Sequence, residues 1–127
     1  MRTLFATLAV ASLLSNPARA ADAPAAPALH AIILVDVIPD RVVPGNEAKS
    51  MALLHALVAS SLKEPGNLGF LVLQDVGRPN HLTLDETWTT QAAYEVHEGG
   101  SASKAFRTGI QPMLGAPLDE RLSLELK

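Results

Sequence analysis

The pattern of apolar and polar positions along the chain predicts four β-strands. The first is a run of Val, Ile and Leu that ends at a proline and has few polar interruptions, which is typical of a strand covered on both faces. The last two alternate between apolar and polar residues. The strands are expected at residues 29–38, 68–75, 81–88 and 119–126. A glycine and a proline between the second and third predict a β-hairpin.

Three further segments have the spacing of helices. In residues 46–63, apolar residues and one histidine are spaced at intervals of three and four, so that they form one stripe along a helix. A Pro-Gly-Asn turn follows. The predicted stripe consists of Ala48, Met51, Leu54, His55, Val58 and Leu62. A threonine pair at 89–90 can cap a short helix that runs to about Glu98. Ser101 can begin another helix, which ends or kinks near Pro112 because proline lacks an amide donor.

The predicted order of elements is β-α-β-β-α-α-β. This order is typical of the split βαβ plan of ferredoxin-like folds, an α+β class in which helices cover one face of an antiparallel sheet. The other face of the sheet would be bare, and a second copy packed against it would cover it. A homodimer is therefore expected.

The N-terminal segment predicts export. A short basic start precedes an apolar run, and the small-residue pattern Ala18-Arg19-Ala20 follows, as in a secretory signal peptide (residues 1–20) cleaved after Ala20. The run is shorter than the roughly 20 residues that a membrane span needs. Alanines and prolines in residues 21–28 predict a flexible linker, which leaves 29–127 as the folded domain. We therefore expect a periplasmic or secreted protein without stable membrane insertion.

Composition narrows the classes of partner and of chemistry. The chain has thirteen acidic and ten basic residues and no basic stripe, so it is a poor candidate for binding nucleic acid. It has no cysteine, which excludes disulfides, thiol nucleophiles and thiolate metal sites. Its four histidines are widely spaced and form neither HxH nor HExxH, so no metal site is predicted.

The stretch DETWTTQAAYEVH, residues 85–97, holds the only Trp and the only Tyr of the chain. Glu86 and Trp88 share one face of the predicted strand, and Tyr94 and His97 are neighbours on the helix that follows. The apolar face predicted for this helix consists of Ala92, Ala93 and Val96. We predict that these side chains line one mouth between sheet and helices. The aromatic residues could equally be core residues with satisfied polar tips, and His97 a histidine favoured by the helix dipole.

His55 is a second candidate for a base. It falls within the stripe of the long helix, which would turn it towards the sheet. It could act as a base in a pocket, or it could be a core histidine bonded to a carbonyl, and the residue pattern leaves both readings open.

Several short motifs occur along the chain in a characteristic order. They are Pro44-Gly45, Leu73-Gln74-Asp75, Asn80-His81, Glu86 with Trp88, Ala93 with His97, Phe106, and Pro117 with Arg121. In this order and spacing, the part of the chain that contains these motifs resembles the antibiotic biosynthesis monooxygenase (ABM) domain. The resemblance implies a ferredoxin-like protomer, a dimeric α/β barrel and a pocket between sheet and helices.

The resemblance also implies a type of chemistry. Family members with known activity oxidise quinols or polycyclic phenols with O₂, without flavin, metal or haem, so no cofactor is expected. Trp88 and Tyr94 resemble aromatic pocket residues of polyketide-oxidising members, but Leu84 stands where those members have an asparagine. Glu86, Trp88 and His97 instead resemble the quinol-oxidising branch. A haem-degrading branch has a helix histidine and a strand asparagine that this chain lacks.

We therefore expect an exported, cofactor-independent monooxygenase that acts on a quinol or another small phenol. The predicted catalytic residues are His97, His55 and Tyr94, and the predicted substrate-binding residues are Trp88, Glu86, Phe70, Phe106 and Arg107. The alternative is a non-catalytic dimeric module that binds a small apolar ligand. An enzyme needs a base in contact with an open pocket, whereas a non-catalytic module can have the same residues packed together without a pocket.

Overall fold

The computed structural model describes residues 26–126, so the predicted signal peptide and most of the predicted linker lie outside the described residues. The elements are β1 (Leu29–Asp36), α1 (Asn46–Ser61), β2 (Asn67–Gln74), β3 (His81–Trp88), α2 (Gln91–Glu98), α3 (Ser101–Ile110), the 3₁₀ turn η1 (Gln111–Met113) and β4 (Asp119–Leu124). The predicted order of strands and helices is confirmed. Within residues 26–126, no helix is both long and apolar enough to cross a membrane.

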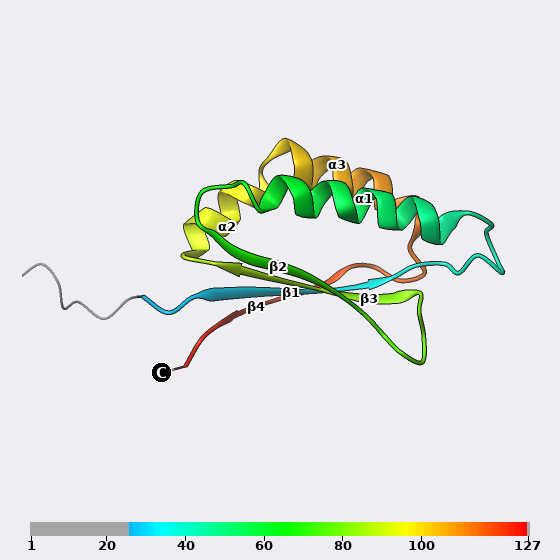
Figure 1. The fold of residues 1–127 in the computed structure, drawn as a ribbon, viewed down its shortest axis with the longest axis horizontal. Helices are drawn as coiled ribbons and strands as arrows, with labels where there is room; N and C mark the ends of the chain where they lie inside the picture. The colour runs from blue at the N-terminus through cyan, green and yellow to red at the C-terminus, as the bar shows by residue number, and fades with distance from the viewer. Residues whose placement is uncertain (1–25, 127) are drawn as a thin grey trace, which may run out of the picture.

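The strands form one antiparallel sheet in the order β2-β3-β1-β4. All three α-helices lie on the same face of this sheet (Figure 1). This is the ferredoxin-like α+β fold expected from the order of elements. Within residues 26–126, no element covers the opposite face of the sheet.

Strand β3 contributes both core residues and candidate site residues to the buried face of the sheet. Its residues alternate in burial, and those beneath the helices are Leu82, Leu84, Glu86 and Trp88. Three of the four are apolar, but Glu86 is a carboxyl group with no exposed surface. The strand that builds the core thus also places an ionisable group within it, and such a group needs polar partners.

The core consists of two clusters. The larger one joins side chains from the sheet, α1 and α3, and it includes Phe70 and Phe106, which were predicted to bind substrate. The smaller one lies at the other end of β1 and consists of Leu29, Ala31, Trp88 and Tyr94. The predicted aromatic residues are therefore divided between two places, and only Trp88 and Tyr94 share a cluster.

The buried stripe of α1 differs from the predicted one. The buried residues are Asn46, Ser50, Leu54, Leu57 and Ser61. The Ser61 hydroxyl donates to the Leu57 carbonyl at 2.8 Å, and the Asn46 amide donates to the Ile38 carbonyl at 3.1 Å. Because these polar groups have partners, the helix can bury them, and its rotation leaves His55 exposed. The prediction that His55 faces the sheet was wrong.

The predicted apolar face of α2 was also wrong. Ala92 and Val96 are exposed, while Tyr94 and His97 are the buried residues of this helix. The Thr90 hydroxyl accepts a hydrogen bond from the Ala93 amide at 3.1 Å, which confirms the predicted cap. Packing of Tyr94 against the smaller core cluster decides which side of this short helix faces inwards.

Candidate functional site

Four of the predicted site residues meet in one buried cluster between β3 and α2. The indole nitrogen of Trp88 donates to Oε2 of Glu86 at 3.0 Å, and the same oxygen lies 3.4 Å from Nε2 of His97. The ring centroid of Trp88 lies 4.8 Å from that of His97 and 6.3 Å from that of Tyr94. Glu86, Trp88, Tyr94 and His97 therefore lie close together as predicted, but all four are buried and pack against one another, so they do not line the open mouth that was predicted.

Burial controls the ionisation of two members of the cluster. It raises the pKa of Glu86 from 4.5 to about 7, against the smaller opposing effects of His97 and of the hydrogen bond from Trp88. Near neutral pH this carboxyl group can therefore both accept and release a proton. Burial also raises the pKa of Tyr94 well above its ordinary value, with the carboxylate of Glu120 acting in the same direction. The Tyr94 phenol consequently stays protonated and remains a hydrogen-bond donor.

Two polar atoms of the cluster have no hydrogen-bond partner within the described part of the chain. They are Oε1 of Glu86 and the hydroxyl oxygen of Tyr94, and both are buried. A buried polar atom without a partner costs about 1–3 kcal/mol, and such costs are concentrated at functional sites. An acceptor and a donor are thus available to receive the polar group of a small ligand.

His97 is held by residues that the sequence did not indicate. Its Nδ1 lies 3.1 Å from Oε1 of Glu64, and its Nε2 lies 2.9 Å from the Ser103 hydroxyl. Glu64 belongs to the turn after α1 and Ser103 to α3, and no local spacing relates either residue to His97. Although carboxyl groups flank this histidine, no group of three or more His, Asp or Glu side chains within residues 26–126 is arranged to hold a metal ion.

Arg107 lies beside the buried cluster and pairs with two carboxylates. Its guanidinium group contacts Glu98 and Glu120. Oε1 of Glu98 in turn lies 3.8 Å from Nε2 of His97. Arg107 is therefore connected to His97 through a single carboxylate.

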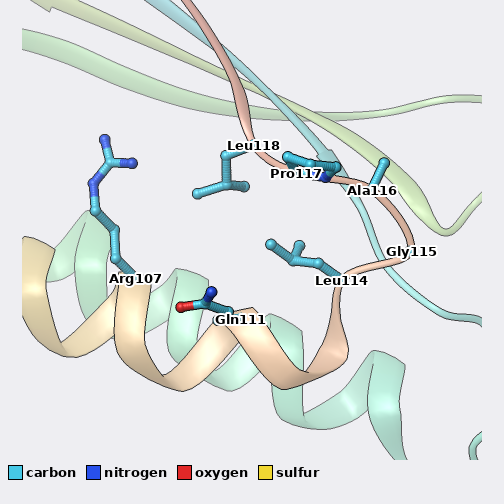
Figure 2. A pocket seen from close by; sticks show the side chains of 7 residues that line it. All are labelled: Arg107, Gln111, Leu114, Gly115, Ala116, Pro117 and Leu118. Carbon is cyan, nitrogen blue, oxygen red and sulfur yellow. The ribbon is translucent and has the colours of Figure 1, made fainter.

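A cavity of about 500 Å³ opens between α3 and the segment that leads into β4 (Figure 2). Arg107 and Gln111 come from the helical side, and Leu114 and Leu118 project into the space from the other side. The complete lining is Arg107, Gln111, Leu114, Gly115, Ala116, Pro117 and Leu118. A mostly apolar cavity of this size with one cationic side chain fits a small aromatic molecule.

The structure does not bring all predicted site residues to this cavity. Arg107 lines it, but the buried cluster does not open into any of the three cavities described for residues 26–126. Phe70 and Phe106 lie in the larger core cluster, although Phe70 pairs directly opposite Glu86 in the sheet. His55 lies on the exposed side of α1. The arrangement is thus a packed acid–base cluster that Arg107 and its carboxylates connect to an open apolar cavity.

Solved structures of similar fold come from several bacteria. A putative antibiotic biosynthesis monooxygenase from Nitrosomonas europaea has a TM-score of 0.72 and 21% sequence identity, covering 80% of this chain and 92% of its own. A protein from Pseudomonas aeruginosa has a TM-score of 0.71 and 24% identity, covering 83% and 100%. A possible oxidoreductase from Bacteroides thetaiotaomicron has a TM-score of 0.69 and 20% identity, covering 80% and 100%. At these identities the similarity establishes the fold alone.

Sequence comparison identifies the family. A search of curated proteins finds no match. The family model described as "Antibiotic biosynthesis monooxygenase" matches residues 37–109, which is more than half of the chain and includes α1, β2, β3, α2 and nearly all of α3. The matched region contains the whole buried cluster and Arg107. The chain therefore belongs to the antibiotic biosynthesis monooxygenase family.

Proposed function

We propose that this protein is an exported, cofactor-independent monooxygenase that oxidises a quinol or another small phenol with O₂. The observation that carries the proposal is the buried Glu86–His97 pair, in contact with Trp88 and beside an unpartnered acceptor and an unpartnered donor. Family membership and the neighbouring apolar cavity support it. Export rests on the sequence of residues 1–20, and protein recovered from its host should then begin at Ala21.

The first step of the proposed reaction is deprotonation of the substrate. His97 acts as the base, Glu86 orients its ring and stabilises the imidazolium, and the Tyr94 hydroxyl donates to the phenolate oxygen. Trp88 supplies an aromatic wall. The substrate first binds in the apolar cavity. It reaches the buried cluster when the ion pairs of Arg107 with Glu98 and Glu120 separate.

The substrate itself supplies the electrons. A phenol that becomes a quinone takes up one O₂, keeps one oxygen atom and releases the other as water, so that four electrons leave the substrate. A quinol reacts in the same way: it takes up one O₂, keeps one oxygen atom as the hydroxyl group of a hydroxyquinone and releases the other as water, so that four electrons again leave the substrate. The phenolate is the form that passes an electron to O₂, which is why removal of the hydroxyl proton is the step that the protein must promote.

Oxygen uptake by the purified protein tests this function. With menadiol and a small panel of phenols, and without added cofactor, we expect uptake well above autoxidation. His97→Gln should lower the rate at least about a hundredfold, because it removes the base. His55→Ala is the matched control, since it removes an exposed histidine, and it should leave the rate unchanged. The proposal fails if the folded protein gives no uptake with any substrate, or if His97→Gln keeps the full rate.

A second candidate function is favoured by the tight packing of the cluster. Trp88, Tyr94 and His97 are each no more than 2% exposed, so the protein could instead bind a small apolar molecule without transforming it. In that case ligands would bind in the cavity beside Arg107 and change the fluorescence of the single tryptophan, while oxygen uptake would stay at the autoxidation rate.

We also propose that two copies pack through the uncovered face of the sheet. On this face Leu71 and Leu73 are 59% and 52% exposed, and Leu34 lies near the middle of the sheet with 38% exposed. The first strand has few polar interruptions, which is typical of a strand that is covered on both sides. A stable interface of about 800 Å² per partner would cover this apolar centre.

The oligomeric state tests the proposed interface. We expect light scattering to give twice the protomer mass and Leu71→Glu to give a monomer, because an unpaired charge would be buried. Leu62→Glu is the matched control, because Leu62 is 55% exposed but follows α1 in the helical layer. A wild-type protein that stays monomeric at high micromolar concentration would contradict the proposal.

A further inference from the structure

A chain of ionisable groups runs from the surface to the buried carboxyl of Glu86. Its outer member is Glu64, whose side chain is 26% exposed, and its middle member is His97, whose side chain is 1% exposed. Glu86 is fully buried. Oε1 of Glu64 lies 3.1 Å from Nδ1 of His97, and Oε2 of Glu86 lies 3.4 Å from Nε2. The two nitrogens of one imidazole ring thus face an outer and an inner carboxyl group.

Three separate parts of the fold position Glu64, His97 and Glu86. Glu64 is fixed in the turn between α1 and β2, where its amide donates to the Ser61 carbonyl at 3.0 Å and its carbonyl accepts from the Asn67 amide at 3.2 Å. His97 lies in the last turn of α2, and Glu86 lies in β3, two residues before the end of the strand. The alignment therefore depends on tertiary structure and does not follow from neighbouring positions in the sequence.

Hydrogen bonding sets the direction in which a proton can move. The Trp88 indole can only donate, so Oε2 of Glu86 is an acceptor. The carboxylate of Glu64 can likewise only accept, so we assign the proton of the neutral His97 ring to Nδ1. The lone pair of Nε2 then faces the Ser103 hydroxyl and the carboxyl group of Glu86.

We propose that Glu64, His97 and Glu86 form a proton path between the buried cluster and solvent, in which Glu64 is a positioning residue that acts through His97. A proton that leaves Glu86 binds Nε2 of His97, while the Nδ1 proton moves to the Glu64 carboxylate and from there to water. Until that release one carboxyl group has lost a proton and the other has gained one, so the charge of the protein is unchanged; release to water then leaves both carboxyl groups ionised and the proton in solvent. The use of this path in turnover rests on the proposed oxidation, because protons taken from the substrate must leave the site.

Other charged and titratable groups face this path and set its environment. Glu98 on α2 lies 3.8 Å from Nε2 of His97 and is paired with Arg107 of α3, which also binds Glu120 of β4. The ring of Tyr94 on α2 lies near the His97 ring, with a centroid distance of 6.1 Å and an angle of 36° between the ring planes. Glu98 is almost as exposed, at 24%, but it is paired with Arg107 and lies farther from the ring, so Glu64 is the solvent-exposed carboxylate that is hydrogen-bonded to His97.

Hydrogen–deuterium exchange of the Glu86 carboxyl group tests the path without any need for activity. The infrared C=O band of the protonated acid, assigned by its loss in Glu86→Gln, shifts when its proton is replaced by deuterium. About one pH unit below the Glu86 pKa the carboxyl group is mostly protonated. We expect Glu64→Gln to slow this exchange at least about tenfold, and Glu64→Asp, which can still carry a proton, to slow it less. Glu95→Gln, which changes an exposed carboxylate of α2, should exchange as the wild type does.

The same variants separate the proton path from the proposed function. If menadiol is oxidised, Glu64→Gln should lower kcat at least about tenfold, leave KM unchanged and be partly rescued by added imidazole. If exchange slows but the wild-type protein consumes no O₂, the path holds and the oxidation is wrong. Unchanged exchange in a folded Glu64→Gln protein overturns the path, whatever the activity. Should Glu64→Gln fail to fold, Glu64→Ala takes its place, and unchanged exchange in that folded variant overturns the path instead.

Discussion

Replacing Trp88 by alanine is expected to lower the free energy of unfolding by roughly 3–5 kcal/mol, the largest effect of any single truncation in this site. Trp88 has no exposed surface and anchors the smaller core cluster. The substitution leaves a large cavity next to α2 and also removes the indole donor of Glu86. Because small domains are stable by only about 5–15 kcal/mol, this loss is a large part of the total.

Chemical denaturation with two companion variants separates these contributions. Trp88→Phe keeps much of the apolar volume but leaves Glu86 without its donor, so we expect a loss of about 1–3 kcal/mol. Tyr94→Phe removes a buried hydroxyl that has no partner among the described residues, so it should be neutral or stabilising by about 1 kcal/mol. A loss of less than about 1 kcal/mol for Trp88→Ala would show that the cluster is not tightly packed.

Replacing Glu86 by glutamine is expected to change how stability depends on pH. Burial raises the pKa of Glu86 to about 7, so the folded protein holds this proton more tightly than the unfolded chain, whose carboxyl has its ordinary pKa of 4.5. The stabilising contribution is therefore complete below about pH 4.5 and is lost as pH rises through about 7. The loss amounts to roughly 3 kcal/mol, at about 1.4 kcal/mol for each pH unit.

Glu86→Gln should remove this loss, because the amide is similar in shape and does not ionise. We expect the variant to be more stable than the wild type at about pH 8, with the difference shrinking towards about pH 5. Hydrogen bonds to Glu125 and Asp85 also raise the pKa of His30. The stabilising contribution of His30 is therefore likewise lost as the pH rises. It is present in both proteins, so the difference between them isolates Glu86. Parallel stability curves would show that Glu86 is ionised in the folded protein throughout this range.

The composition of the site was predictable in part because it lies in one short stretch. Glu86 and Trp88 are two apart on a strand, and Tyr94 and His97 are three apart on a helix. A turn of only two residues joins these elements, so the inward faces of both must meet. Local geometry was sufficient to place these four residues together, and it was also sufficient to place the Thr90 cap.

Local geometry failed where polar residues occupy buried positions. The stripe of α1 was inferred from its apolar residues, but Ser50 and Ser61 are buried in their place, and His55 is consequently exposed. A serine can be buried at little cost when its hydroxyl bonds to a carbonyl of the same helix, as Ser61 does. Such a helix has a weak apolar pattern, and its orientation depends on what packs against it.

Sequence patterns alone predict the order of strands and helices, the class of fold and the proximity of Glu86, Trp88, Tyr94 and His97. These features depend on periodicity, caps and turns, all of which act over a few residues. Such patterns could not predict that Glu64 and Ser103 bind His97, that Arg107 lies between Glu98 and Glu120, or that His55 is exposed. Those contacts join separate elements, and the packing of α1, α2 and α3 on the sheet creates them.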